Sequence, residues 1–387
     1  MKINTSKYDI SEETPLNTIT QLPQNNYEDL GFYSMLRKGA LSVHANLISS
    51  VFISPNGNKC KIGDSETFSI SDILLEKIIQ QVNSVAANPE FIWFGSKPLQ
   101  AGIGFYRKVV KLQKKHGLLD NAARNSIQIN DNILDEDWAQ FLRENNFNIG
   151  IDIENSLNKE DKSNYIYLEN ESQNKVMQMV NCLKKHDKIF GILTIYNKKG
   201  SSPEKLMNYF MKNKVFKFDI SLNYNNLDIS ATDYADYICE LFDLWLSWGE
   251  SSLRIKFFDD LIQTFWGLSS NICWLNGNCP NNIRVDLEGN VWPCCDHVLP
   301  YDQYRLGNIN QESMIDILQG EKFLRFRKVY SELPTRCLGC EWSHICKGGC
   351  AYHRLINGGG EDGGDHLCAA YKKIFQHIFD RYKTLFN

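Results

Sequence analysis

The cysteines of this chain are concentrated near its C-terminal end, where nine of the twelve lie in the last third of 387 residues. Eight of them form a group of three, a group of four and one that follows alone: Cys273, Cys279 and Cys294; Cys337, Cys340, Cys346 and Cys350; and Cys368. The first group reads C-x5-C-x9-G-x4-C and the second C-x2-C-x5-C-x3-C. Thiolates at this density suit zinc or iron–sulfur clusters, because one ion or cube takes four ligands. The spacing therefore predicts two four-thiolate metal sites.

Composition limits the classes of protein and partner. With 43% hydrophobic and 23% charged residues the chain is typical of a globular protein. A net charge of -4 and a pI near 6.1 provide no basic surface, so we expect neither nucleic acid nor an anionic membrane as partner. The sequence has no run of 18 apolar residues, so we expect no membrane span. Its first residues lack the apolar segment of a secretory signal, so we expect a cytoplasmic protein. Thiols stay reduced there, which favours metal over four disulfides.

Short apolar runs alternate with segments of helical periodicity up to about residue 265. The expected strands are Leu41–Asn46, Phe91–Phe94, Ser126–Asn130, Ile149–Ile153, Phe190–Tyr196 and Phe216–Leu222. The expected helices are Ile73–Val85, Phe105–His116, Asp135–Asn145, Gln173–His186, Glu204–Asn213 and Tyr234–Trp248. This alternation indicates parallel βαβ units. We predict an α/β fold, a partial (β/α)6 TIM-like barrel that stays open, with Leu253–Phe258 as a linking strand.

The chain changes character after the barrel. Asn282–Asp286 and Asn290–Pro293 predict a hairpin with its turn at Glu288-Gly289. Met314–Gln319, Lys322–Tyr330 and Ala369–Leu385 predict helices. We expect three parts: an N-terminal extension (1–40), the barrel (41–265) and a cysteine-rich α+β domain (266–387). Metal sites are expected to contribute folding energy to the last.

The two cysteine groups resemble the SPASM domain of radical S-adenosylmethionine (SAM) enzymes, above all the anaerobic sulfatase maturases and related peptide maturases. The resemblance covers roughly residues 40 to 370. Beyond the cysteines, the segments that carry it are Phe91-Ile-Trp-Phe-Gly95, Phe105-Tyr-Arg-Lys-Val-Val, Asn125-Ser-Ile-Gln-Ile-Asn130, Leu134-Asp-Glu-Asp-Trp138 and Arg305-Leu-Gly-Asn-Ile309.

The resemblance implies two auxiliary [4Fe–4S] clusters. Cluster I would use Cys273, Cys279, Cys294 and Cys350, and cluster II would use Cys337, Cys340, Cys346 and Cys368. Spacing alone also fits two zinc sites. Cys295 would be a bystander, and Cys60, Cys182 and Cys239 are typical of ordinary buried thiols. Four residues lie near ligands in the sequence, and either packing around the loops or tuning of the clusters would explain them: Trp274, Trp292, Trp342 and His344.

The catalytic cluster of a radical SAM enzyme needs C-x3-C-x2-C after the first strand, and no such triplet exists here. Cys60 is the one cysteine before Cys182, and one thiolate cannot hold a cube that needs three. We align the missing ligands with Ala45, Ser49 and Phe52, using Asn46-Leu47 as the marker, so that Phe52 would fill cluster space.

Two further departures accompany the missing triplet. The family's G-G-E-P motif, which receives the SAM amino group, reads Gly95-Ser96-Lys97-Pro98 here. A lysine in place of the carboxylate would repel that group, although a solvated lysine is the simpler interpretation. Beside Cys294 the maturases carry an aspartate as base. This chain has Cys295 there and Asp296 one place later, so we name no catalytic residue.

We expect an accessory or substrate-binding protein in maturation of a peptide or protein, with two clusters and without SAM radical chemistry of its own. By analogy with ribosomal-peptide systems of the grasp-with-spasm type, its partners would be a precursor peptide or protein and an active maturase or ligase. The alternatives are an electron-transfer subunit, an active SAM enzyme with atypical ligation by His44 and Cys60, and a structural zinc module.

Overall fold

The computed structural model describes residues 47–55, 70–86, 88–95, 97–118, 124–129, 134–154, 166–167, 171–186, 190–196, 201–222, 229–277, 281–293, 302–356 and 362–384. These ranges all belong to one unit, Ala45–Asn387. The predicted extension (1–40) and the predicted strand Leu41–Asn46 lie outside them. The predicted boundary near residue 265 stays a prediction.

A mostly parallel sheet forms the centre of this unit. Its parallel path runs β1 (Ser50–Ile53), β2 (Glu90–Trp93), β3 (Arg124–Ile129), β4 (Asn148–Glu154), β6 (Phe190–Tyr196), β7 (Lys217–Leu222) and β8 (Arg254–Ile255). The short β5 (Ile166–Tyr167) pairs with β4 off this path. At the other edge β9 (Asn282–Val285) pairs in parallel with β1, followed by antiparallel β10 (Asn290–Pro293) and β11 (Gly307–Asn308). Among the described strands the path stays open from β11 to β8.

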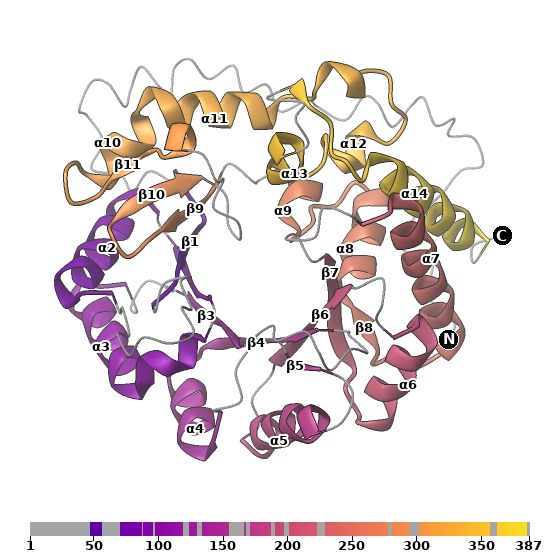
Figure 1. The fold of residues 1–387 in the computed structure, drawn as a ribbon, viewed down its shortest axis with the longest axis horizontal. Coiled ribbons are helices and arrows are strands. Elements are labelled where there is room, and N and C mark those ends of the chain that lie inside the picture. Colours follow the sequence, from indigo (N-terminus) through magenta and orange to yellow (C-terminus); the bar gives the residue numbers. More distant parts are fainter. Residues whose placement is uncertain are drawn as a thin grey trace, which may run out of the picture. The chain divides into compact units, whose positions relative to one another are not determined.

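Helices follow the strands in alternation and lie outside them in Figure 1. They are α2 (Asp72–Val85), α3 (Gly102–Lys115), α4 (Glu136–Glu144), α5 (Glu171–Lys185), α6 (Pro203–Lys212), α7 (Ala231–Trp248) and α8 (Lys256–Phe265). Side-chain caps begin several of them. Asp135, for example, accepts the backbone N–H of Trp138 at 2.9 Å, which satisfies a donor that the first turn of α4 leaves free.

The core lies between the strands and these helices because successive strand side chains point to opposite faces. In β1, Val51 and Ile53 are fully buried, whereas Phe52 between them is half-buried. Phe91 and Trp93 repeat the pattern in β2. Val51 is the register partner of Phe91, and Ile53 is that of Trp93, so these four side chains share the face that the helices cover. Phe52 points to the other, inner face of the curved sheet.

The sequence located most elements within a few residues. The five strands predicted from Phe91 to Leu222 and the six predicted helices are confirmed. The strand predicted at Leu253–Phe258 is wrong beyond its first residues: β8 is two residues long and the charged, amphipathic segment from Lys256 forms α8. The described first strand is Ser50–Ile53, a short apolar run that no predicted element covers.

The C-terminal part is built on the hairpin of β9 and β10, as predicted. Gly289 has a φ of +82° at the turn, and Asp286 accepts the backbone N–H groups of Glu288 and Asn290. The short helix α9 (Cys273–Asn276) precedes the hairpin. After the hairpin the described residues form the helices α10 (Met314–Gln319), α11 (Glu321–Ser331), α12 (Ser343–Cys346), α13 (Ala351–Ile356) and α14 (Cys368–Lys383).

Helix α14 ties the C-terminal part to the barrel. It lies beside α7 in Figure 1, and ion pairs join the two helices. Lys373 pairs with Asp236, and Arg381 Nε lies 2.8 Å from Asp243 Oδ1.

In the described ranges we find no helix with the length and hydropathy needed to cross a membrane.

Candidate metal centre

Four of the predicted ligands line one small cavity. Cys337, Cys340, Cys346 and Cys368 surround it together with the ring of Trp342. Cys337 ends a 3-10 turn, Cys346 is the last residue of α12 and Cys368 is the first residue of α14. The start of α14 thus supplies a fourth thiol to a site whose other three come from one short segment. This is the set that the sequence assigned to cluster II.

The spacing of these thiols is wider than a single zinc ion needs. Four thiolates at 2.3 Å from one tetrahedral ion lie about 3.8 Å apart. In the described part of the chain, no three of the four sulfur atoms lie within 4.8 Å of one another. In a cubane each thiolate binds its own iron, so its sulfur atoms are farther apart. The donor set and its spacing therefore fit an iron–sulfur cluster better than zinc.

The second site is described in part. Cys273 is the first residue of α9, and Cys350 directly precedes α13. The two thiols are close enough for Cys273 to raise the pKa of Cys350, after the larger effect of burial. Cys279 and Cys294 lie outside the described residues, as do Cys295, Asp296, His44 and Cys60. The structure thus brings together members of two different sequence groups, the crossing that cluster I requires.

The thiols fit a metal and are poorly suited to ionise alone. Burial is the largest cause that raises the pKa of Cys346, Cys350 and Cys337. Neighbouring thiols and Asp365 raise it further for Cys346 and Cys350. Such groups become thiolates when a cation compensates their charge, so metal binding would be coupled to proton release.

Asp365 holds the two halves of this region together, and the sequence analysis missed it. Its carboxylate accepts the backbone N–H of Cys350 at 3.0 Å and that of Leu367 at 2.9 Å. His353 Nδ1 lies 3.0 Å from the same carboxylate, and Asp365 is 3% exposed. A buried carboxylate with three partners fixes the backbone next to both Cys350 and Cys368. No spacing rule marks an aspartate that follows a glycine-rich segment, so its role could not be recognised from the sequence.

Two glycines allow the chain to turn between Cys346 and Cys350. Gly348 and Gly349 have φ values of +85° and +83°. A Cβ on Gly349 would lie 2.5 Å from Asp365 Cβ, and one on Gly348 would lie 2.7 Å from Pro334 Cδ. These positions need glycine for both backbone conformation and space.

Aromatic rings surround the thiols. Trp342, 8% exposed, packs against Phe375 with ring centroids 5.9 Å apart. Trp274 stacks on Tyr371 at 4.7 Å, which links α9 to α14. Trp292 Nε1 donates to Asp286 at 3.0 Å in the hairpin, and His344 lies in α12. Of the four, Trp342 lines the four-thiol cavity.

The segment after β1 is where the family's missing triplet belongs, and the structure corrects its position. Ser49 precedes β1 and Phe52 lies inside it, so neither follows the first strand. Ala45, the first position of that alignment, lies outside the described residues. The chain between β1 and α2 contains one cysteine, Cys60. Ser49 and Phe52 therefore do not stand where the triplet belongs, and the shortage of thiols is unchanged.

The carboxyl ends of β1, β2 and β9 carry aromatic rings and positive charge. Phe52 meets Phe94 edge to face at 5.6 Å, and the guanidinium of Arg284 lies 4.7 Å above the Phe94 ring. Phe52 and Arg284 are register partners on one face of the sheet, and Arg284 is 4% exposed. Lys97 follows Phe94 at the start of the 3-10 turn Pro98–Ala101.

A cavity of about 710 Å³ opens at the opposite, amino ends of β4, β6 and β7. Its charged lining includes Arg143, Lys217, Asp219, Lys256 and Asp260. Burial raises the pKa of Asp219 to about 6. Asp260 accepts the backbone N–H of Asn271 at 2.8 Å, two residues before Cys273.

Cys182 and Cys239 lie outside both thiol sites. Cys239 is buried in α7, as predicted. Cys182 in α5 is half-buried, so its prediction as a buried thiol is wrong. It lies next to Glu136 and His186.

Comparison with known proteins agrees with these observations. Residues 277–341 match a family model described as SPASM, an iron-sulfur cluster-binding domain. The cysteine-type anaerobic sulfatase-maturating enzyme of Clostridium perfringens is 29% identical over 337 residues, which are 82% of this chain and 88% of that protein. The SPASM match and the maturase relatives support a radical SAM/SPASM maturase family for this chain.

Other members of this family are similar over comparable lengths. The serine-type anaerobic sulfatase-maturating enzyme of Bacteroides thetaiotaomicron is 27% identical over 337 residues, covering 80% of this chain and 81% of that protein. The solved structure of native anSMEcpe with bound AdoMet and Cp18Cys peptide superposes with a TM-score of 0.73 and 26% identity. That match covers 87% of this chain and 98% of that one. The expected α/β fold with a C-terminal SPASM domain is confirmed.

Proposed function

We propose that this protein binds a peptide or protein substrate during post-translational maturation, carries two [4Fe–4S] clusters in its SPASM region, and does not cleave AdoMet. One observation carries the proposal. The eight SPASM cysteines are all present, whereas the chain between β1 and α2 holds Cys60 alone. A cube that leaves one iron open for AdoMet needs three protein thiolates, and one thiolate cannot replace them.

Cluster ligation is proposed as the sequence assigned it: Cys273, Cys279, Cys294 and Cys350 for cluster I, and Cys337, Cys340, Cys346 and Cys368 for cluster II. The shared cavity of the second set and the proximity of Cys273 to Cys350 support it. When bound, such clusters supply single-electron transfer. The chain's own residues position them: Asp365 fixes the Cys350 backbone, and Trp342 covers the four-thiol cavity. A reducing, cytoplasmic environment belongs to the proposal because eight thiols must stay reduced.

The positive charge at the end of β2 supports the absence of AdoMet chemistry. AdoMet carries a sulfonium and an ammonium group, and Lys97 stands where the family has a carboxylate for the ammonium. Arg284 adds a second cation over the Phe94 ring. Like charges in a partly buried site repel. The solved relative holds AdoMet, so this part of the proposal separates the chain from it.

A peptide is the proposed substrate because the relative's structure was solved with the Cp18Cys peptide, and because a large charged cavity adjoins the Cys273 segment. The basic and acidic groups of that cavity suit a polar peptide. A precursor peptide encoded beside this protein, with an active maturase or ligase as partner, would complete the system.

The test is made on protein purified and reconstituted without oxygen. We expect about eight irons per chain, from two cubes of four, and no 5′-deoxyadenosine when AdoMet and dithionite are added. The Clostridium perfringens enzyme, treated identically, is the positive control. Release of 5′-deoxyadenosine at a comparable rate would refute the absence of AdoMet chemistry. Protein with zinc and no iron would refute the clusters.

A further inference from the structure

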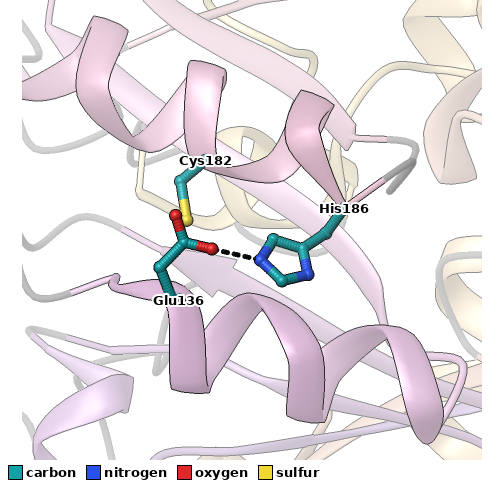
Figure 2. A group of neighbouring side chains, drawn as sticks. All are labelled: Glu136, Cys182 and His186. Carbon is teal, nitrogen blue, oxygen red and sulfur yellow. Dashed lines mark hydrogen bonds and ion pairs between the residues drawn. The ribbon is translucent and has the colours of Figure 1, made fainter.

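A group of metal-ligating side chains lies on the helical layer, outside the SPASM region. The ligand atoms of Glu136, Cys182 and His186 all lie within 4.8 Å of one another. Figure 2 shows the three side chains converging between α4 and α5. Glu136 is the first residue of α4, and Cys182 and His186 are at the C-terminal end of α5.

The helix geometry places two of these donors on one face. Cys182 and His186 are four residues apart, and the His186 backbone N–H still donates to the Cys182 carbonyl at 3.3 Å, as in a helix. Side chains at i and i+4 lie one above the other, which is the arrangement that pairs two ligands on one ion in helical zinc sites. Glu136 reaches the same point from the neighbouring helix, where it bonds His186 Nε2.

The donor types select the ion. Thiolate, imidazole and carboxylate are the three ligands that zinc takes in proteins, whereas magnesium and calcium require oxygen donors. The side chains of Glu136 and His186 are 56% and 17% exposed, so an ion can enter from water. Water would complete the fourth position of the tetrahedron.

We propose that Glu136, Cys182 and His186 bind one zinc ion, which joins α4 to α5. The site is independent of the proposed function, because none of its residues belongs to the SPASM thiols or lies near the carboxyl ends of β1 and β2. Lys185 is the competing partner of Glu136, with Nζ 2.8 Å from Oε1. Its ammonium leaves the carboxylate when zinc binds, and because this pair is exposed, breaking it costs little.

The experiment uses the full chain with its iron–sulfur clusters reconstituted, so that the SPASM thiols are not available to zinc. Zinc binding is measured by calorimetry and by metal analysis in wild type, Cys182→Ser, His186→Ala and Glu136→Gln. Cys239→Ser is the matched control, since Cys239 lies on another outer helix and belongs to no ligand group among the described residues. Equal iron content in all five proteins shows that the clusters are unaffected.

We expect wild type and Cys239→Ser to bind one zinc more than Cys182→Ser and His186→Ala, with about tenfold or more weaker binding in Glu136→Gln. Cobalt in place of zinc should give a thiolate charge-transfer band in the metal-difference spectrum of wild type and of the control, and none with Cys182→Ser. Equal zinc uptake by wild type and Cys182→Ser overturns the site, and so does a wild-type protein that takes up no zinc.

Discussion

The SPASM region and the carboxyl ends of β1 and β2 belong to the same fold and differ in the number of thiol ligands that they contain. In the SPASM region the thiols, the glycines between Cys346 and Cys350 and the supporting Asp365 form one interlocked unit. At the ends of β1 and β2 the scaffold is intact, with strands in parallel register, yet the chain that follows β1 has one cysteine. The core of the barrel therefore does not depend on a full set of thiol ligands at its carboxyl edge, because that core lies between the strands and the helices.

The largest expected effect tests which thiols hold iron. Cys346→Ala should lower the iron content from about eight to about four per chain, because a cube with three of four thiolates is readily lost. Cys60→Ala should leave the iron unchanged. Iron and sulfide are counted after anaerobic reconstitution. Loss of four irons in the Cys60 variant would contradict the comparison, since it would place a cluster in the barrel.

The next test rebuilds the missing ligands. Asn56→Cys combined with Gly63→Cys gives the spacing C-x3-C-x2-C around Cys60. If the barrel lost this site through its ligands alone, iron should rise from about eight to about twelve per chain. We expect AdoMet cleavage to stay absent, because Lys97 after β2 and Arg284 in β9 remain.

Rebuilding has its own control. The single variant Asn56→Cys supplies two thiolates and should stay near eight irons. An unchanged iron content in the double variant would show that the carboxyl edge has also lost the room for a cube, and the half-buried ring of Phe52 would be the side chain to shorten next.

How far the sequence predicted these two regions follows from how each signal arises. The alternation of strands and helices came from apolar periodicity, so β2, β3, β4, β6 and β7 were located closely, whereas the two-residue β5 was not predicted. The strand Ser50–Ile53 was missed because it is four residues long and neighbours other apolar residues. α8 was missed because Leu253–Phe258 reads equally well as strand or helix, a common ambiguity of short apolar runs.

The residues of the candidate sites likewise fall into those that the sequence predicted and those that it did not. Cysteine spacing and the family resemblance grouped the thiols, and the described ones lie together accordingly. Asp365 could not be predicted, because its role depends on hydrogen bonds to the Cys350 and Leu367 backbone that only the folded chain creates. The cluster of Glu136, Cys182 and His186 was missed because its members lie on two helices, and Cys182 alone resembles an ordinary thiol.

A third prediction concerns the turn between the two thiol sets. Gly349→Ala should destabilise the reconstituted protein by about 3 kcal/mol, because it combines an unfavourable φ with a Cβ 2.5 Å from Asp365 Cβ. Gly339→Ala is the matched control: its φ is +78°, but nothing lies within 4 Å of the added carbon. It should cost about 1 kcal/mol. Free energies of unfolding from denaturant titration measure both, and equal losses would show that Asp365 yields to the new methyl group.

The smallest expected effect concerns the cavity at the amino ends of β4, β6 and β7. Burial raises the pKa of Asp219 to about 6 from 3.8, so protonation stabilises the fold. That contribution is complete below pH 3.8 and is lost as the pH rises through about 6. Between pH 5 and pH 7 wild type should lose about 1 kcal/mol relative to Asp219→Asn, whose amide does not titrate.

Denaturant titration at the two pH values measures this difference for Asp219. Asp259→Asn, a substitution at another carboxylate of the same cavity, controls for the change in net charge and should follow wild type. The carboxylate of Asp219 accepts the backbone N–H groups of Ile220 and Phe257 but is desolvated by its surroundings. Its charged form is therefore stable only where Lys256 or a positive ligand compensates the charge. If the stability of wild type and of Asp219→Asn changed equally with pH, Asp219 would already be ionised and solvated at pH 5. The cavity would then be more open to water than its lining indicates.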